Sequence, residues 1–295
     1  MTAGAVGGVL RGYFENYGGV CYLANTAGRT LKETLAAVEA FDDVTILVPL
    51  GPWDQGADAA GEQARAVAAY TAGHHAMAIL HADRDHNAPQ ARDAANTFKL
   101  DADQSAHTAL YHPWLIPTGN GAEPVPPVGV VAGAWAHNDS TRGLGKAPAG
   151  RVDKVARLAL KVSDKEVGEA RSVNFLREIQ GQGTQIRGAR TLDDPAGTWR
   201  YISVRRLADA VERDLQKALR AVASEPNSRP TWDREGGSAA LQGNQKPAAY
   251  FVMIGQNTMS KEDAKAGRLI LKVGIAPTSP ADFIVVTVTG TAGKA

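Results

Sequence analysis

Histidine and aspartate are concentrated between residues 74 and 86, in a pattern that could hold a metal ion. The group consists of His74, His75, His81, Asp83, Asp85 and His86. Imidazole and carboxylate groups near strand ends are the usual ligands of hydrolytic metal centres. However, the spacing matches no common ligand motif, and the other histidines are His107, His112 and His137. We therefore favour a solvated polar loop, and keep a metal-dependent hydrolase of α/β fold that uses loop 81–86 as the alternative function.

Two other kinds of chemistry lack their motifs. Gly143-Leu-Gly145-Lys146 looks like part of a phosphate-binding loop, but no Gly-x-x-x-x-Gly-Lys-Ser/Thr sequence occurs. Pro148, two residues after the lysine, removes a backbone N–H that such a loop would use. No Gly-x-Ser-x-Gly nucleophile elbow is present. We predict that the protein is not an enzyme, and that it has no catalytic residues, no cofactor and no bound metal.

The composition is that of a folded protein without a polyanionic partner. Of 295 residues, 44% are hydrophobic and 21% charged, and 32 basic side chains nearly cancel 31 acidic ones. Such a balance provides no broad positive field for nucleic acid. The single cysteine, Cys21, excludes an internal disulfide, and no apolar run approaches the ~20 residues that span a bilayer. We expect no direct membrane insertion, and folding and assembly in the cytoplasm.

Strand and helix patterns alternate along the first half of the sequence. The apolar run 44–50, bounded by Pro and Gly, is typical of a strand covered on both faces. Strands separated by helices predict a mainly parallel sheet flanked by helices, and hence an α/β fold. The predicted strands are 20–24, 44–50, 76–80, 109–114 and the Ala-Gly-rich run 128–135, and the predicted helices are 31–41, 59–72 and 89–100.

The second half contains one long helix and a β-rich end. Apolar residues recur at three- and four-residue steps over 203–223, which predicts an amphipathic helix. Strands are predicted over 249–254 and 269–275. Between them lies a short helix that Ser260 and Asp263 could cap.

Arginine and aromatic residues are concentrated between 188 and 207. Because Trp199 and Tyr201 alternate with Arg200 and Ile202, we expect the two rings to form a core face. The arginines could bind an anionic partner, but such residues more often form solvated faces or structural ion pairs. We predict a structural joint between two parts of the chain, made by Arg190, Trp199, Arg200, Tyr201, Arg205 and Arg206.

Several of these patterns together resemble the tail sheath proteins of contractile phages and phage-like injection systems. The resemblance rests on Gly-Ala-Arg-Thr-Leu, Trp-Arg-Tyr-Ile and Val-Arg-Arg-Leu within 188–207, on Pro-Pro-x-Gly, Asp-x-x-Arg-Gly and Lys-Ala-Pro-Ala within 126–149, on Glu-Pro-Asn before Trp232, and on Gly-Arg-Leu and Pro-Ala-Asp-Phe-Ile near the end. Family members usually have Asn at the position of Gly150 and Glu at that of Asp282. The long helix that follows Trp232 in the family is shortened or absent in this sequence.

The resemblance implies both a domain organisation and an assembly. An α/β sheath domain of subtilisin-like fold would occupy 1–186, and an α+β C-terminal sheath domain would occupy 187–295. The chain would form a homo-oligomer of hexameric rings, stacked helically around an inner tube protein and bounded by baseplate and sheath-terminating proteins. Contraction of this phage tail or injection-system particle would drive the tube through a target cell envelope. From the resemblance we expect this chain to lack the N-terminal arm that usually precedes the position of Ala5 in the family.

A β-branched and aromatic strand is predicted near the C-terminus. Eight extended residues reach about 26 Å, and a long apolar edge strand aggregates unless it is paired. From the residues alone, this strand could close its own sheet or add to a neighbouring subunit's sheet. The resemblance favours the second, because sheath subunits share sheets through extended terminal arms. The predicted subunit-linking strand is Asp282, Phe283, Ile284, Val285, Val286, Thr287, Val288 and Thr289.

Overall fold

The chain divides into two compact units, Met1–Arg206 and Leu207–Ala295. The computed structural model describes residues 3–119, 122–169, 172–221, 250–254, 258–266, 268–275 and 284–291. The domain boundary expected from the resemblance, between 186 and 187, falls within the first unit and stays a prediction. Among the described helices, none is both long and apolar enough to cross a bilayer.

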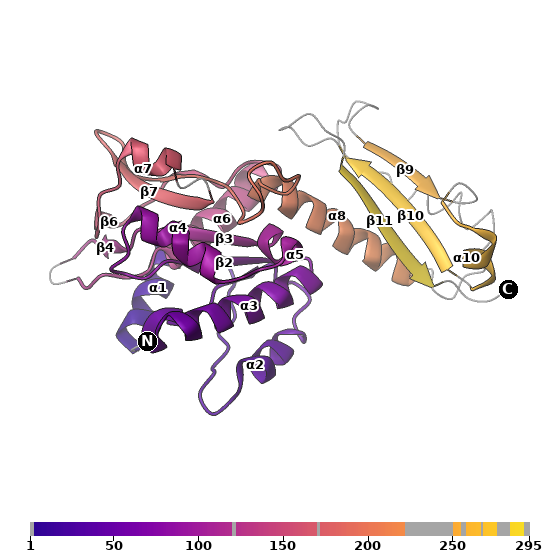
Figure 1. The fold of residues 1–295 in the computed structure, drawn as a ribbon, viewed down its shortest axis with the longest axis horizontal. Coiled ribbons are helices and arrows are strands. Elements are labelled where there is room, and N and C mark those ends of the chain that lie inside the picture. The colour runs from indigo at the N-terminus through magenta and orange to yellow at the C-terminus, as the bar shows by residue number, and fades with distance from the viewer. Residues whose placement is uncertain are drawn as a thin grey trace. The chain divides into compact units, whose positions relative to one another are not determined.

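The first unit is built on a six-stranded sheet with the strand order β1-β2-β3-β7-β8-β5 (Figure 1). The first four strands in this order are parallel neighbours, and the last two extend the sheet antiparallel. The mixed α/β class with a helix-flanked sheet is thereby confirmed. The strands are β1 (Ile46–Leu47), β2 (Met77–His81), β3 (Thr108–His112), β7 (Val173–Ile179), β8 (Gly183–Arg187) and β5 (Gly150–Arg151).

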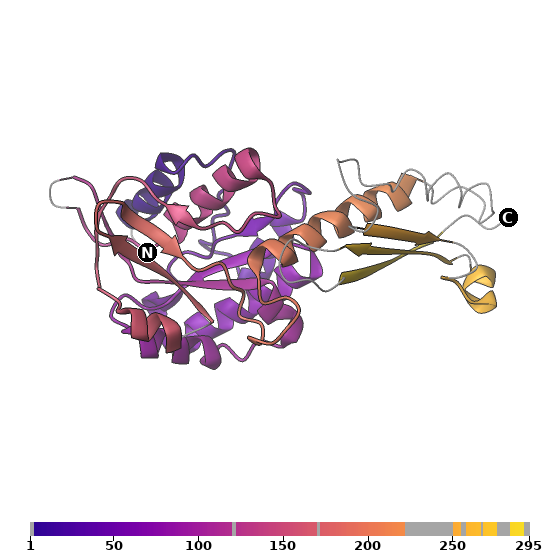
Figure 2. The ribbon, with the colours of Figure 1, turned by 90° about the horizontal axis from the view of Figure 1, so that it is seen from above.

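The central strands β2 and β3 are buried at every position. Alternate side chains point to opposite faces of a strand, so each strand supplies two cores. Met77 and Ile79 of β2 pack into one core, while Ala78 and Leu80 pack into the other. Helices cover both faces of the sheet, as Figure 2 shows. Burial on both faces explains why these strands read as continuous apolar runs in the sequence.

The helices of this unit mostly follow the predicted positions. Thr30 and Glu33 form the predicted capping box at the start of α2, and Asn87 with Gln90 forms another at α4. A two-stranded antiparallel ribbon, β4 (Leu115–Pro117) with β6 (Val155–Leu158), adjoins the sheet. The helices are α1 (Ala3–Glu15), α2 (Leu31–Val38), the 3-10 turn η1 (Pro52–Gln55), α3 (Ala57–Gly73), α4 (Ala88–Thr97), α5 (Ala102–Ala106), α6 (Val128–Arg142), α7 (Asp164–Glu169) and α8 (Ile202–Ala221), of which α8 continues into the second unit.

The strand predicted over 128–135 is wrong, because these residues begin α6. Two glycines one turn apart let the backbone of α1 approach this helix closely. A Cβ atom at Gly129 would lie 2.1 Å from the carbonyl oxygen of Val9, and one at Gly133 would lie 2.4 Å from that of Tyr13. Gly129 and Gly133, which made the run look unlike a helix, therefore allow α1 and α6 to pack closely. Helix α1 itself lies in the glycine-rich start, where no element was predicted.

One further strand prediction is wrong, and another is confirmed only in part. Residues 20–24 form no strand and are exposed throughout. The strand predicted over 44–50 contains only the two residues of β1, and all seven residues are half-buried rather than covered on both faces. The reason is positional: β1 is the first strand of the sheet, and no described residue pairs with its outer side.

The second unit contains an antiparallel sheet of three strands in the order β11-β10-β9. The strands are β9 (Tyr250–Ile254), β10 (Arg268–Ile275) and β11 (Ile284–Thr291), and the short helix α10 (Lys261–Lys265) precedes β10. The backbone N–H of Ser260 donates to Asp263 Oδ2 at 2.9 Å, and that of Asp263 donates back to Ser260 Oγ at 3.0 Å, so the predicted cap is confirmed. The predicted change after Trp232 lies outside the described residues.

Candidate functional site

Three of the seven histidines gather near the carboxyl ends of two neighbouring strands. His81 ends β2, His112 ends β3, and His86 follows in the loop after β2. The side chains of His81 and His112 are 1% and 0% exposed. We refer to His81, His86 and His112 as the histidine cluster. Sequence reasoning weighed the first two as metal ligands with Asp83, and treated His112 only as a further histidine.

Two members of the histidine cluster, His81 and His112, are buried in surroundings that disfavour a charged imidazole. No described residue forms a hydrogen bond with His81 Nε2, with His86 Nδ1 or with either ring nitrogen of His112. Burial lowers the pKa of His81 to about 4. Burial, together with the neighbouring His86 and His81, also lowers the pKa of His112 to about 4. Near pH 7 both imidazoles are therefore neutral.

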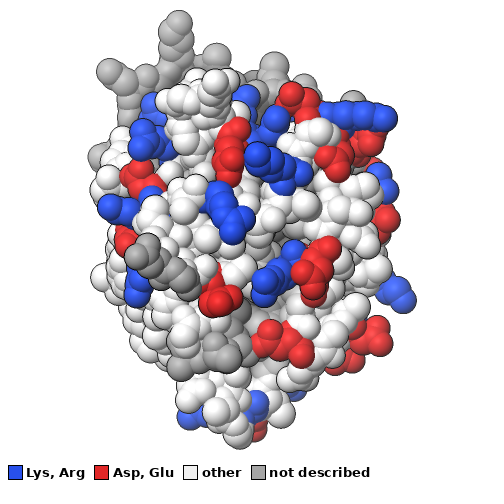
Figure 3. All heavy atoms as spheres, turned by 90° about the vertical axis from the view of Figure 1, so that its left-hand side faces the viewer, with Lys and Arg blue, Asp and Glu red and all other residues white. Residues whose placement is uncertain are grey.

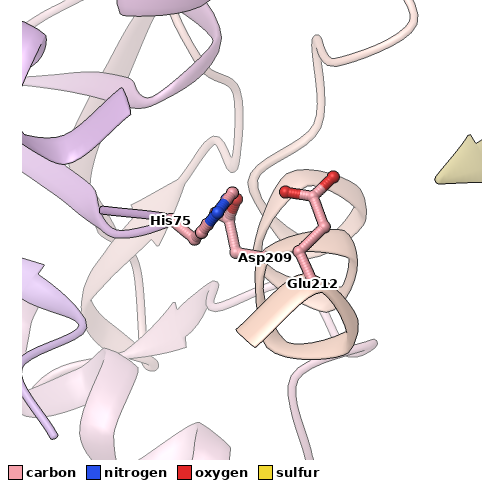
Figure 4. A group of neighbouring side chains, drawn as sticks. All are labelled: His75, Asp209 and Glu212. Atoms are coloured by element: carbon pink, nitrogen blue, oxygen red, sulfur yellow. The ribbon is translucent and has the colours of Figure 1, made fainter. Parts of the chain in front are cut away.

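The cluster does not form the metal site of the alternative hydrolase hypothesis. Asp83 is occupied locally, because its Oδ1 accepts the backbone N–H of Asp85 at 2.9 Å. Within either unit, the described residues contain no group of three possible metal ligands whose atoms all lie within 4.8 Å of one another. Figure 4 draws Asp209 and Glu212 on α8 together with His75, but the carboxylates belong to the second unit and His75 to the first. We assign no metal site to them.

The remaining histidines have structural surroundings. His74 stacks on Tyr70 with 4.0 Å between ring centroids, and the ring of His137 lies 4.6 Å from that of Tyr17. His107 Nδ1 lies 2.8 Å from the carbonyl oxygen of Asp103. Gly143, the first residue of the apparent phosphate loop, follows the C-terminus of α6 rather than opening a helix. The geometry of an anion-binding helix N-terminus is thus missing at this loop.

The predicted joint begins with a closed loop ahead of α8. The backbone N–H of Thr191 donates to the carbonyl oxygen of Arg200 at 3.1 Å, and that of Ile202 donates to Ala189 at 3.1 Å. Buried Asn174 of β7 ties the loop to the sheet. Its Nδ2 donates to the Arg190 carbonyl at 2.7 Å, and its Oδ1 accepts the Arg190 N–H at 2.8 Å. The start of α8 is therefore anchored to the sheet of the first unit.

Arg206 makes the strongest contact of this joint. Its guanidinium binds both carboxylate oxygens of Asp139 on α6, with an Nη1–Oδ1 distance of 2.7 Å. It also lies 4.9 Å from the ring centroid of Trp135. The indole N–H of Trp135 in turn donates to the hydroxyl of Tyr111 at 3.1 Å. Because Arg206 is only 4% exposed, this two-point pair replaces water around a buried charge.

The other arginines of the joint stack on aromatic rings. Arg205 is 4% exposed and lies 4.0 Å from the ring centroid of Trp199. Arg200 and Arg190 lie 5.0 and 5.7 Å from the ring centroid of Tyr201. The Arg200 guanidinium lowers the pKa of the Tyr201 hydroxyl. The structure thus brings the six predicted residues together, with half-buried rings between cations rather than within an apolar core.

Sequence reasoning missed the residues that hold this joint in place. Asp139, Trp135 and Asn174 all contribute, and Asp139 lies 67 positions before Arg206. The one available signal was the Asp-x-x-Arg-Gly sequence that Asp139 opens. This motif carries part of the family resemblance, but it does not indicate that Asp139, which lies in α6, pairs with an arginine so far along the chain. These contacts fix the positions of side chains within the first unit, and the role of the six residues as a joint between two parts of the chain stays a prediction.

The terminal strand pairs within its own unit. All eight residues of β11 pair antiparallel with β10, from Ile284 opposite Ile275 to Thr291 opposite Arg268. β11 is also an edge strand, since β10 is its only partner among the described residues. Of the predicted linking strand, Asp282 and Phe283 lie outside the described residues. Ile284, Val285, Val286, Thr287, Val288 and Thr289 all lie in β11.

Charges are mixed on the face of the molecule drawn in Figure 3. Basic and acidic side chains alternate across it, and no field of one sign extends over this view. Such a face offers little electrostatic attraction to a polyanion.

Comparison with known proteins identifies the family. No protein-family model matches the sequence, and no curated protein sequence matches it. Among solved structures, the chain is 32% identical to a chain from the contracted sheath complex of an extracellular contractile injection system, PVC. That match covers 96% of this chain and 79% of the other, with a TM-score of 0.77. The chain belongs to the contractile tail sheath family.

Two more solved structures agree with this assignment. The sheath chain is 28% identical to a chain of the contracted helical sheath of the anti-feeding prophage, with a TM-score of 0.74 over 97% of this chain and 82% of the other. A sheath tail protein from Desulfitobacterium hafniense has 12% identity and a TM-score of 0.60, over 93% of this chain and 63% of that one. This last likeness supports the fold alone. The comparisons favour a structural subunit over the hydrolase that loop 81–86 suggested.

Proposed function

We propose that this sheath chain is the repeating subunit of a contractile sheath. It assembles as a homo-oligomer of hexameric rings stacked helically around an inner tube protein, between baseplate and sheath-terminating proteins. Contraction then drives the tube through a target cell envelope. The observation that carries the proposal is the 32% identity to a contracted sheath chain over 96% of this sequence. Similar chains occur in the anti-feeding prophage baseplate, at 30 and 31% identity.

In this role the protein needs no catalytic site. Energy is stored in a kinetically trapped extended assembly, and contraction moves whole subunits into a better-packed arrangement. Such movement requires rigid bodies and strong joints. The buried pair of Arg206 with Asp139, and Arg205 on Trp199, supply such a joint. We propose that the first part has the subtilisin-like sheath fold over 1–186, without a catalytic triad, and that the C-terminal sheath domain occupies 187–295.

We also propose that residues 282–289 link neighbouring subunits. The support is that β11 has a partner on one side only among the described residues. An edge strand of eight residues offers main-chain N–H and C=O groups to a strand from the next subunit, and the alternate side chains fix the register. Pairing with β10 and linkage to a neighbour are compatible, because they use opposite sides of β11.

Two proline variants test this linkage. In an antiparallel edge strand, successive N–H groups point alternately toward the inner partner and outward. Of Val286→Pro and Thr287→Pro, one therefore removes a bond to β10 and the other removes an outward donor. We expect the outward variant to keep the melting temperature of the dispersed chain and to lose tube formation in negative-stain electron microscopy.

The matched control is the chain shortened after Thr291, which keeps the strand and should form normal tubes. Normal tubes from the thermally unaffected proline variant would contradict the linking role of β11.

A further inference from the structure

Exposed apolar side chains of the sheath chain gather in one stretch of the sequence. Among the described residues, seven large hydrophobic side chains are strongly exposed, and six of them lie between positions 14 and 41. Val20 and Leu23 are 85% and 65% exposed. A concentration of this kind marks an interaction surface, whereas single exposed apolar residues are ordinary. The six residues are Phe14, Tyr17, Val20, Tyr22, Leu23 and Phe41.

The centre of this stretch is an extended-type sequence that forms no secondary structure, and we refer to residues 20–24 as the free segment. Residues 20–24 carry the β-prone sequence Val-Cys-Tyr-Leu-Ala, and the structure leaves them in no helix or sheet. They make no backbone–backbone hydrogen bond with any described residue. One side-chain contact reaches their backbone, from the hydroxyl of Tyr13 to the carbonyl oxygen of Val20 at 3.4 Å. The segment therefore presents both main-chain groups and apolar side chains to a partner.

The same chain carries an open sheet edge of matching character. β1 pairs with β2 on its inner side, and no described residue pairs with its outer side. The surrounding run Val-Thr-Ile-Leu-Val-Pro-Leu is half-buried at all seven positions from 44 to 50. For comparison, β2 and β3 have a neighbouring strand on each side and are buried at every position. One more strand on the outer side of β1 would cover this run.

Local contacts join the free segment to residues just before β1 in its own chain. The hydroxyl of Tyr22 donates to Asp43 Oδ2 at 3.1 Å, and its ring lies 4.3 Å from the ring of Phe41. Both partners precede β1. The order of free segment, α2 and β1 is that of a β-α-β unit, so closure within one chain and exchange between two chains would make the same contacts. Exchange of an identical element is for this reason a low-cost route to association.

We propose that residues 20–24 of one sheath chain add as a strand to the outer side of β1 in a second copy. The partner is a second copy because each chain provides one free strand and one free edge, and because chains of this family occur in helical sheaths. Such a head-to-tail contact repeats from copy to copy and suits an extended assembly. The inference rests on the proposed assembly into a sheath, and it concerns a contact separate from that of β11.

The first test places charge in the free strand. Val20→Lys combined with Leu23→Lys should reduce the yield of tubes at least tenfold by electron microscopy. The melting temperature of the dispersed chain should not change, because both side chains are exposed there. Thr26→Lys combined with Ala27→Lys adds the same charge at exposed positions just outside the strand and should leave the tubes intact.

Three outcomes of this test have distinct meanings. Normal tubes from the Val20 and Leu23 variant would overturn this inference and leave the proposed function standing. A lowered melting temperature of that variant would place the strand in its own chain, which also overturns the inference. If the unaltered protein forms no assembly, both this inference and the proposed function fail.

The second test uses Cys21, the only cysteine, as a native probe. Thr45→Cys and Ile46→Cys place a thiol on either face of the β1 edge. After assembly and mild oxidation, one of these variants should give a ladder of covalent multimers in gel electrophoresis, and Cys21→Ala should abolish it. An internal disulfide in single chains, or no disulfide in either variant, would overturn the inference. Paired strands bring Cα atoms within the range that a disulfide spans.

Discussion

The histidine cluster and the predicted joint each contain buried titratable side chains, and the two regions accommodate that burial in opposite ways. His81 and His112 are neutralised, since their pKa values fall to about 4 and several of their ring nitrogens have no partner among the described residues. The guanidinium of Arg206, by contrast, is matched by a carboxylate and an indole ring. Removing the carboxylate that pairs with Arg206 should therefore lower the free energy of unfolding strongly. Protonating His81 or His112 should also lower it strongly.

The largest effect is expected at the buried ion pair. Asp139→Ala leaves the Arg206 cation buried without its carboxylate, which should lower the unfolding free energy by about 3 kcal/mol. Urea denaturation followed by tryptophan fluorescence measures this change. The matched control is Asp93→Ala, which removes the carboxylate of the exposed Arg92–Asp93 pair and should cost less than about 1 kcal/mol. Equal losses of unfolding free energy in the two variants would contradict the expected difference between a buried and an exposed ion pair.

The next effect concerns pH and the histidine cluster. An unfolded histidine titrates near pH 6.5, whereas folded His81 and His112 titrate near 4. Between these values the unfolded chain binds protons that the folded chain does not, so stability falls as the pH is lowered. Each histidine should account for about 2 kcal/mol of loss between pH 7 and 5.

Unfolding free energies of the unaltered chain and of His112→Leu at the two pH values test this expectation. Between the two pH values, the free energy of unfolding of the His112→Leu variant should fall by less than that of the unaltered chain. A stability that stays constant from pH 7 to 5 would show that the cluster is not buried as neutral imidazole.

The smallest effect is expected at the stacked arginine. Trp199→Leu keeps an apolar side chain but removes the ring 4.0 Å from Arg205, and should cost about 1 kcal/mol. Trp199→Phe retains a ring and should lower the free energy of unfolding by a smaller amount. Denaturation curves of the two variants compare them directly. An equal loss in both would indicate that packing, rather than the cation–ring contact, makes Trp199 important.

The comparison also explains what the sequence could predict. The six residues assigned to the joint lie close together in the chain, so their stacking contacts with one another could be expected from the sequence, whereas their role as a joint stays a prediction. Their partner Asp139 was missed because it lies 67 positions away and no local pattern marks a distant ion pair. The histidines differ from the joint residues. Those that resembled metal ligands are close together in the sequence, but a metal site depends on which side chains the folded strands bring together.

The fold follows a similar rule. The strands β2 and β3 and the helix α8 were predicted from apolar periodicity, because burial alone determines these patterns. Helix α6 was missed, since its glycines serve the close approach of α1, which is a tertiary contact. Residues 20–24 have the composition of a strand but no partner among the described residues. A strand needs a neighbour, and local sequence does not specify whether that neighbour is in the same chain.

Negative-stain electron microscopy of the purified, unaltered chain tests the central claim most directly. A structural sheath subunit should assemble into hollow, helically ordered tubes or stacked rings without added metal or substrate. A monodisperse monomer at every concentration and salt condition, combined with stoichiometric bound metal by elemental analysis, would contradict the account and favour the hydrolase.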